Sequence, residues 1–446
     1  MSDWKKVKIG EIFKIEKGSL QSSKCIPGKY DFITAASEWK THESYSHECE
    51  AIVYAVAASG SLGRAHYVNG KFIASDLCFI LTEKDKEKYP INFQFYQLIF
   101  ELIRGEIVSK TKTGTSKESI NQKNFSNYEI PYFSFDYQMA NYEKLVNTKQ
   151  KISELLEESE KQKSYAKQLR QNILQEAIEG KLTEEWRKEN PVVKGNPDFD
   201  AEALFEKIQE EKRHTDSELL RNSKKKVFEP IAEYEQPFEI PEGWKWVRLG
   251  EICDIIGGYA FNSYDLKPTG DNYVLRLGNI RNNKIRYEAK PAFISNKITE
   301  NLDIYKAKLN DIFLTMTGTR GKQDYLYSVL VSKEHLEKYQ MFVNQRVCII
   351  RSIFYPGYVY KTLHSDVLKK PIFESATGSA NQANVGIKAI NDWVIPFPPL
   401  AEQKETIKQV EKLLANVVEL EKQITERETL SEKLTFGIIK EKLEGK

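Results

Sequence analysis

Polar side chains with the chemistry for reading DNA gather at three places in the sequence. Arg, Lys, Asn and Gln can reach the edges of bases, while Ser, Thr and backbone N–H groups bind phosphate oxygens. The first place is a pair of glycine turns, residues 59–64 and 317–322, where glycine permits a close backbone approach and the following cation can reach phosphate or guanine. The candidate DNA-binding residues of these turns are Ser61, Arg64, Thr319, Arg320 and Lys322.

The second place is rich in Lys and Thr in the first half of the chain and in small polar residues in the second half. Its candidates are Lys110, Lys112, Thr113, Thr115, Lys117, Gln122 and Lys123, and in the second half Ser379, Asn381 and Gln382. The third place is a basic, Asn-rich stretch whose candidates are Arg276, Asn279, Arg281, Lys284 and Arg286. A solvated turn is the alternative interpretation of each place.

Motifs for catalysis are missing from the sequence. Residues 318–323 lack the spacing and the final Ser or Thr of a phosphate-binding P-loop. Residues 190–193 depart at their third position from the Asn-Pro-Pro-aromatic signature of amino-methyltransferases. The five Cys and six His are scattered, without the spacing of a zinc site or a disulfide framework. We therefore expect no catalytic residue, no metal and no cofactor in this chain, although a nuclease built from scattered carboxylates stays open.

An internal repeat organises the three places. Residues 4–15 return as residues 244–255, with seven of twelve positions identical. The glycine turns and the second place are repeated farther along, and residues 128–132 return as residues 393–397. Because the order is the same in both halves, the sequence predicts two similar domains.

Each half is expected to end in one long helix. Residues 137–179 contain neither Pro nor Gly, and both helices carry an apolar seam near the spacing of a coiled coil. Two helices of roughly 40 residues would bury these seams on each other as an intramolecular antiparallel pair, with a homodimeric coiled coil as the alternative. The seam residues are Leu145, Ile152, Leu155, Ala166, Leu169 and Ile173, then Val410, Leu413, Val417, Leu420, Ile424, Leu434 and Ile438.

The fold class that follows is α+β, with two globular domains of mixed α and β structure in tandem, separated by the two long helices. β-rich runs bounded by turns predict strands over 51–56, 311–316 and 346–350, and residues 93–103 predict a helix. The expected domains are residues 1–138, 139–190 for the central helix, 191–240 for a partly extended connector with a charged helix over 201–221, 241–400, and 401–446 for the C-terminal helix.

Composition adds a constraint on location and charge. The 446 residues carry a net charge of +2 and no apolar run of the roughly 18 residues that span a bilayer, so we expect a cytoplasmic protein without a membrane partner. Counted over the expected parts, the two globular domains carry +1 and +6, the central helix with the connector −4, and the C-terminal helix −1. The near-neutral sum therefore conceals a modest excess of positive charge on the domains.

Taken together, these features resemble the specificity subunit of a Type I restriction-modification enzyme. The resemblance covers nearly the whole chain. It is carried by the duplicated order of domain and helix and by three motifs. These are Ile173-Leu174-Gln175-Glu176-Ala177-Ile178-Glu179-Gly180-Lys181-Leu182-Thr183-Glu184-Glu185-Trp186-Arg187, Phe238-Glu239-Ile240-Pro241-Glu242-Gly243-Trp244 and Pro396-Phe397-Pro398-Pro399-Leu400-Ala401-Glu402-Gln403. Residues 133–138 of the first half keep only the Gln of the last motif.

The resemblance implies a DNA-binding protein without catalysis of its own. Each globular part would be a target recognition domain for one half of a bipartite, asymmetric DNA site. The helices would act as a spacer and dock two methylation subunits, which would bind S-adenosylmethionine, and restriction subunits could join the assembly. A coiled-coil scaffold without sequence-specific DNA binding and a fused nuclease or methyltransferase are the alternatives.

Overall fold

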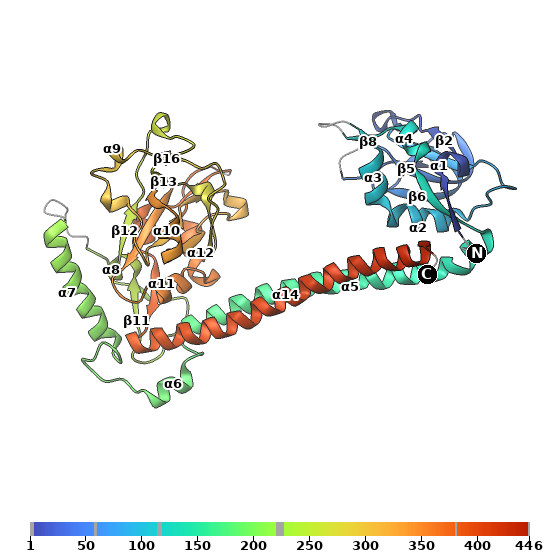
Figure 1. Ribbon diagram of the computed structural model, residues 1–446. Coiled ribbons are helices and arrows are strands. Elements are labelled where there is room, and N and C mark those ends of the chain that lie inside the picture. The colour runs from blue at the N-terminus through green and yellow to red at the C-terminus, as the bar shows by residue number, and fades with distance from the viewer. Residues whose placement is uncertain (1–3, 58–59, 114–117, 220–226, 380, 445–446) are drawn as a thin grey trace. The chain divides into compact units, whose positions relative to one another are not determined.

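The computed structural model describes residues 4–57, 60–113, 118–219, 227–379 and 381–444 (Figure 1). Two units are compact by themselves: residues 1–163 with 422–446, and residues 164–421. Each unit contains one globular domain and parts of both long helices.

The first globular domain is built on one six-stranded sheet with the strand order β2-β7-β5-β6-β3-β4. β3 runs parallel to β6 and the other pairs are antiparallel. The strands are β1 (Trp4–Lys8), β2 (Phe13–Lys17), β3 (Tyr30–Ile33), β4 (Lys40–His42), β5 (His47–Ala55), β6 (Ala65–Ala74), β7 (Cys78–Glu83), β8 (Lys112–Thr113), β9 (Ser119–Ile120) and β10 (Glu129–Phe133). The helices are α1 (Ile9–Ile12), η1 (Ser22–Lys24), α2 (Phe93–Leu102), α3 (Arg104–Thr111) and α4 (Gln122–Asn127).

Both faces of this sheet are covered, which explains the unbroken apolar run in β5. Residues 51–55 are fully buried and alternate between two core clusters. The larger cluster packs the aromatic side chains of α2 against Phe13, Tyr54 and Phe125. The strand predicted over 51–56 and the helix predicted over 93–103 are confirmed by β5 and α2.

The second globular domain divides the same plan between two sheets, β12-β21-β17-β19 and β16-β13-β20. Its strands are β11 (Lys245–Arg248), β12 (Cys253–Gly257), β13 (Asn272–Leu275), β14 (Ile280–Arg281), β15 (Lys284–Ile285), β16 (Phe293–Ile294), β17 (Ile312–Thr315), β18 (Thr317–Gly318), β19 (Ser328–Leu330), β20 (Gln340–Val343), β21 (Val347–Ser352), β22 (Ala383–Asn384) and β23 (Val394–Phe397). The helices are α8 (Leu249–Ile252), η3 (Ser263–Asp265), η4 (Leu277–Asn279), α9 (Asn296–Thr299), η5 (Asp303–Tyr305), η6 (Arg320–Lys322), α10 (Lys333–Lys338), α11 (Pro356–Thr362), α12 (Asp366–Ser375) and α13 (Ile387–Asn391). β17 and β21 confirm the other two predicted strands.

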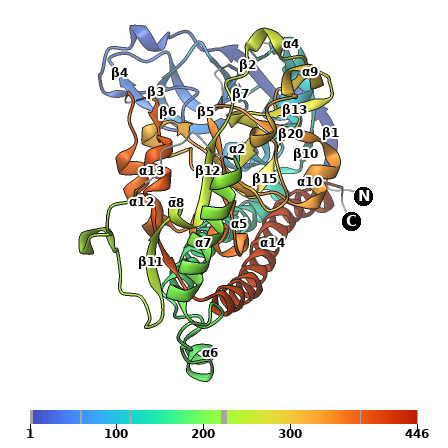
Figure 2. The same ribbon diagram turned by 90° about the vertical axis from the view of Figure 1, so that its left-hand side faces the viewer.

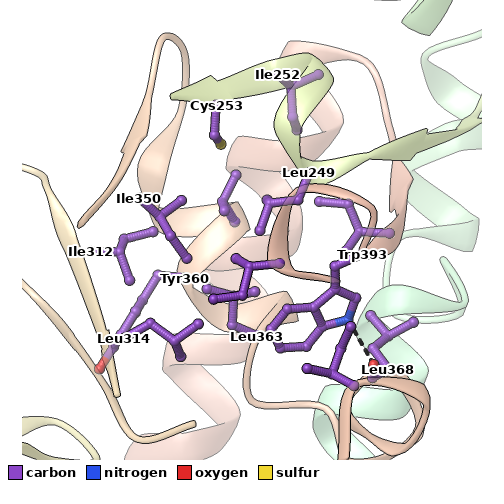
Figure 3. Packing of buried hydrophobic residues seen from close by; sticks show 14 of the residues in the cluster. Leu249, Ile252, Cys253, Ile312, Leu314, Ile350, Tyr360, Leu363, Leu368 and Trp393 are labelled. Carbon is purple, nitrogen blue, oxygen red and sulfur yellow. Dashed lines mark hydrogen bonds between the residues drawn. The ribbon is translucent and has the colours of Figure 1, made fainter. Parts of the chain in front are cut away.

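Figure 3 shows the centre of this second domain, where Trp393 lies among apolar side chains from α8, β17, β21 and α11. The indole is 2% exposed and its Nε1 donates a hydrogen bond to the carbonyl oxygen of Leu368 at 2.7 Å. Because the one polar atom of the ring is satisfied, the tryptophan can be buried without an unpaired donor.

The repeat in the sequence is also a repeat in backbone pairing. β1 pairs with β10 so that Lys6 lies opposite Pro131, and β11 pairs with β23 so that Trp246 lies opposite Pro396. After each first strand the same bond follows, from Ile9 N to the oxygen of Tyr128 at 2.9 Å and from Leu249 N to the oxygen of Trp393 at 2.8 Å. The two domains therefore share one architecture, and the expected α+β fold in tandem is confirmed.

The two long helices pair with each other in antiparallel fashion within each unit. They are α5 (Phe135–Ile178) and α14 (Leu400–Glu444). In the larger unit Arg170 pairs with Glu421 at 3.0 Å, and in the smaller unit Lys163 pairs with Glu428 at 2.7 Å. Since the numbers rise on one helix as they fall on the other, the pairing is antiparallel, as predicted.

The apolar seam is narrower than the one predicted from the sequence. Leu155, Leu169 and Leu420 were expected in it, but they are 47%, 44% and 39% exposed. Seven of the buried positions follow a seven-residue repeat and include small side chains, which bring the two helices close together. They are Ser159, Ala166 and Ile173 on α5, and Val410, Val417, Ile424 and Ser431 on α14. Leu174 and Ala177 are buried beside them. The side chains of Leu434 and Ile438 lie outside the described part of the chain.

The segment between the central helix and the second domain is not a free linker. It contains α6 (Glu184–Glu189), α7 (Ala201–Leu219) and η2 (Glu233–Glu235). Ala201, Leu204 and Ile208 of α7 belong to the core of the second domain, and Figure 2 shows α7 lying against α8 and β12. Lys212 Nζ donates to the carbonyl oxygens of residues 250 and 253 at 2.9 and 2.8 Å. This part of the chain is therefore a component of the second domain. The sequence predicted a partly extended connector here and did not predict that it packs on that domain.

A buried carboxylate joins three segments at the base of the second domain. Glu402, at the start of α14, is 2% exposed and accepts hydrogen bonds from Thr183 Oγ1 and Trp244 Nε1, both at 2.7 Å. Arg187 Nε lies 3.3 Å from the same carboxylate, and its guanidinium also donates to the oxygen of Gly180. Burial raises the pKa of Glu402, while these donors favour its ionised form. All four side chains belong to the motifs that carry the family resemblance.

Candidate nucleic-acid interface

The glycine turn of the first domain is fastened to its surroundings by two arginines. Gly63 has φ +81°, which favours glycine, and the turn bends there. Arg64 Nη1 donates to the carbonyl oxygen of Ala35 at 2.7 Å and to Ser61 Oγ at 3.2 Å. Arg104, on α3, donates from Nε to the oxygen of Leu62 at 2.7 Å. The guanidinium of Arg64 is therefore half-buried and already shapes the turn, and Arg104 is a supporting residue that the sequence did not reveal.

The second candidate place lies directly beside this turn. Ile120 N donates to the oxygen of Val56 at 2.8 Å, which joins the β8–β9 hairpin to the strand that enters the glycine turn. Lys112 pairs with Glu118 at 2.7 Å, and Thr113 Oγ1 donates to the oxygen of Ser119. Lys110, Lys112, Thr113, Gln122 and Lys123 are exposed, while Thr115 and Lys117 lie outside the described residues.

In the second domain the same two places meet through an equivalent bond. Val385 N donates to the oxygen of Met316 at 2.8 Å, and β18 pairs with β22. Arg320 Nη2 donates to the oxygen of Ala376 at 2.7 Å, so this arginine braces one loop against the other. Thr319, half-buried, bonds through its backbone N to Asp324. The exposed candidates here are Arg320, Lys322, Ser379, Asn381 and Gln382.

The third candidate place is held together by its own side chains. Asn279 is 1% exposed and its Nδ2 donates to Tyr273 Oη at 2.8 Å and to the oxygen of Ala289 at 2.9 Å, so it is a buried structural residue in this conformation. Arg281 lies over the ring of Tyr327 at 5.3 Å, and Arg286 Nη2 donates to the oxygen of Gly278 at 3.0 Å. Arg276 donates to the oxygen of Lys290, and Lys284 is exposed.

A counterpart of the third place exists in the first domain, and sequence reasoning missed it. It is the loop after β3, because β3 pairs in parallel with β6 as β13 pairs with β20. In this loop Trp39 is 39% exposed and its Nε1 donates to His66 Nδ1 at 3.1 Å. Burial lowers the pKa of His66, which leaves the ring neutral and able to accept this bond at pH 7. The loop differs too much in residue type from residues 276–286 for the repeat to be visible.

Among the described residues, no group of three or more His, Cys, Asp or Glu side chains could hold a metal ion. Within the same described residues, every helix is too short or too polar to cross a membrane.

Two related α+β domains, each bringing a glycine turn and a polar hairpin together, define a protein that presents two similar polar surfaces. The sequence profile of the Type I restriction modification DNA specificity domain matches residues 1–174 and 241–427, and the chain belongs to this family. The prediction of a specificity-subunit family is thus confirmed. The description of the family agrees with the expectation of a role in DNA recognition.

Similarity to individual proteins is low and of different extent. The chain is 27% identical over 280 residues to the Type I restriction enzyme EcoAI specificity subunit of Escherichia coli, an alignment that covers 61% of this chain and 44% of that relative. It is 22% identical to the EcoDI specificity subunit of the same organism, over 99% of this chain and 88% of the relative. A solved chain from a study of complex assembly and conformational transition of the type I R-M system matches with a TM-score of 0.61 and 13% identity, covering 99% of this chain and 97% of that one. This last match supports the fold.

Proposed function

We propose that this chain is the non-catalytic DNA-recognition subunit of a Type I restriction-modification complex, in which each globular domain reads one half of a bipartite asymmetric site. The observation that carries the proposal is the repeated convergence of the glycine turn and the polar hairpin, through the bonds Ile120–Val56 and Val385–Met316. Because the loops keep their backbone pairing but differ in side chains, the two half-sites differ in sequence.

Protein partners and location form the second part of the proposal. The long helices carry exposed apolar side chains on faces that the antiparallel pairing leaves open, which suits docking of two methylation subunits. S-adenosylmethionine belongs to those subunits in this proposal, restriction subunits complete the assembly, and the complex is cytoplasmic. The exposed apolar residues of the helices are Leu155, Tyr165, Leu169, Val418, Leu420 and Leu430.

Methylome sequencing of cells with and without the gene tests the proposal. We expect one bipartite motif, two short specific parts with an unspecified gap, to lose its methylation when the gene is deleted. The purified chain alone should modify no DNA, whereas the chain purified with its methylation subunit should methylate that motif. An unchanged methylome in cells whose methylation subunit is active, or methylation by the chain alone, contradicts the proposal.

The exposed basic loop of the second domain gives a narrower prediction. Lys322 is exposed and Arg320 is tied to Ala376, so Lys322 is the better phosphate contact and Arg320 the loop brace. We expect Lys322→Ala to weaken binding of the complex to all DNA sequences and to reduce the slope of log K against log salt by about one. Arg320→Ala should weaken the cognate site more than random DNA, since the loop loses its position. An unchanged affinity and salt slope in the double variant removes this loop from the interface.

A further inference from the structure

The turn between β20 and β21, residues Asn344–Arg346, lies where three loops of the second domain meet. Met316 N donates to the carbonyl oxygen of Arg346 at 3.0 Å, just before the glycine turn begins. Gln345 N donates to the oxygen of Tyr259 at 3.0 Å, and Val347 N donates to the oxygen of Asn344 at 2.9 Å. Asn344 N donates to the oxygen of Leu275 at 2.9 Å, next to residues 276–286. The backbone of this turn is therefore fixed beside the glycine turn and the third candidate place of the domain.

Arg346 is the arginine of this domain whose guanidinium group is available to bind a ligand. Its side chain is exposed, and it forms no hydrogen bond or ion pair with another described residue. The guanidinium groups of the other arginines in residues 241–400 all donate hydrogen bonds within the chain. Most of these bonds go to backbone carbonyl oxygens, and they hold loops in place. These arginines are Arg248, Arg276, Arg281, Arg286, Arg320 and Arg351.

The first domain has the same turn with different side chains. Val56 N donates to the oxygen of Leu77 at 2.9 Å, which is the equivalent of the bond from Met316 N to Arg346. Leu77, at the position of Arg346, is 38% exposed. A rigid position with the same backbone bonds and a different exposed side chain suits discrimination between two half-sites.

We propose that Arg346 is a specificity-determining residue, which reads a guanine in the half-site of the second domain through two hydrogen bonds to O6 and N7 in the major groove. Arginine is suited to this contact because its planar group presents two parallel N–H donors. The inference rests on the proposed function. It names a residue that lies outside the three candidate places predicted from the sequence.

The experiment uses the complete complex of this chain with its methylation subunits and a duplex that contains the methylated motif. A set of duplexes carries each of the four base pairs at every specified position. We expect Arg346→Ala to lower the affinity for the cognate duplex about 10- to 100-fold and to remove discrimination at one G·C pair of one half-site. Arg346→Lys should lose the same discrimination, because an ammonium keeps the charge and lacks the two-donor geometry.

Other outcomes overturn the inference. Uniform weakening on all duplexes, with a salt slope smaller by about one in Arg346→Ala and restored in Arg346→Lys, identifies a phosphate contact. Unchanged affinity and discrimination remove Arg346 from the interface. Arg213→Ala, which removes an exposed arginine of α7, is the matched charge control and should leave discrimination intact. The wild-type complex reports on the bipartite motif in the same assay. Failure of the inference about Arg346 is therefore distinguishable from failure of the proposed function.

Discussion

Replacing Glu402 by alanine is expected to cause the largest loss of stability of any change proposed for this chain. The carboxylate accepts bonds from Thr183 and Trp244 at 2.7 Å and faces Arg187 at 3.3 Å, all in a site where Glu402 is 2% exposed. Its removal leaves the indole N–H of Trp244 without an acceptor, while the hydroxyl of Thr183 and the guanidinium of Arg187 keep only the carbonyl oxygen of Gly180. Breaking a buried, hydrogen-bonded pair from one side costs about 3 kcal/mol.

Thermal unfolding followed by circular dichroism measures this effect. We expect the melting temperature to fall by roughly 6 to 12 °C, using the usual shift of about 2–4 °C per kcal/mol for a domain of this size. Glu426→Ala is the control on the same helix, because Glu426 is 61% exposed and 3.9 Å from its partner Lys422. This control should leave the melting temperature unchanged.

A double-mutant cycle separates the hydrogen bond from general damage. Trp244→Phe removes the Nε1 donor and keeps an aromatic ring at the site. If the carboxylate and the indole are coupled, Trp244→Phe costs less in the Glu402→Ala background than in the wild-type chain, by about 1 kcal/mol or more. Additive losses would show that the two groups act independently, which would contradict a stabilising hydrogen bond between Trp244 and Glu402.

The family motifs could be recognised in the sequence, but the structural role of their residues could not be predicted from it. The buried site around Glu402 shows why. Thr183, Trp244 and Glu402 are separated by about 60 and 158 positions, and the bond from Trp244 to Glu402 spans 158 residues. Local patterns reveal helices and strands, because periodicity is a property of neighbouring residues. Contacts across such separations depend on the tertiary structure. The one residue shared by the two helix entries makes a local contact instead: Nε2 of Gln138 and of Gln403 donates to the oxygens of Phe133 and Pro398, five residues earlier in each half.

The candidate interface could also be predicted only in part. Glycine turns and polar runs are visible as residue types, so the sequence predicts two candidate loops in each domain. The backbone bonds of the structure show that these two loops lie together. Residue type alone does not reveal whether a side chain is available. Asn279 is buried and Arg64 is bonded to Ala35, whereas Arg346 is exposed in a short turn that looks like an ordinary connection.

Recognition of a single half-site should be lost when alanine replaces Gly258. A Cβ at this position would lie 2.2 Å from the carbonyl oxygen of Asn344 and 2.7 Å from that of Val347, both backbone atoms, so the turn that carries Arg346 must move. Gly18 has the equivalent place in the first domain, where a Cβ would lie 2.1 Å from the oxygen of Ser75. The two substitutions therefore displace matching turns in different domains.

For both variants we expect the affinity of the complex for its cognate duplex to fall about 10- to 100-fold, the loss of one or two base contacts, while binding to random DNA and its salt slope stay the same. Gly258→Ala should relax base preference only in one half of the motif, and Gly18→Ala only in the other half. Gly257→Ala is the neighbouring control, because its Cβ would meet the side chain of Ile387 at an ordinary 3.5 Å. Copurification with the methylation subunit and an unchanged circular dichroism spectrum verify that each variant folds. If both variants relaxed the same base pairs, the assignment of one half-site to each domain would be wrong, because a displacement confined to one domain can only alter the bases which that domain contacts.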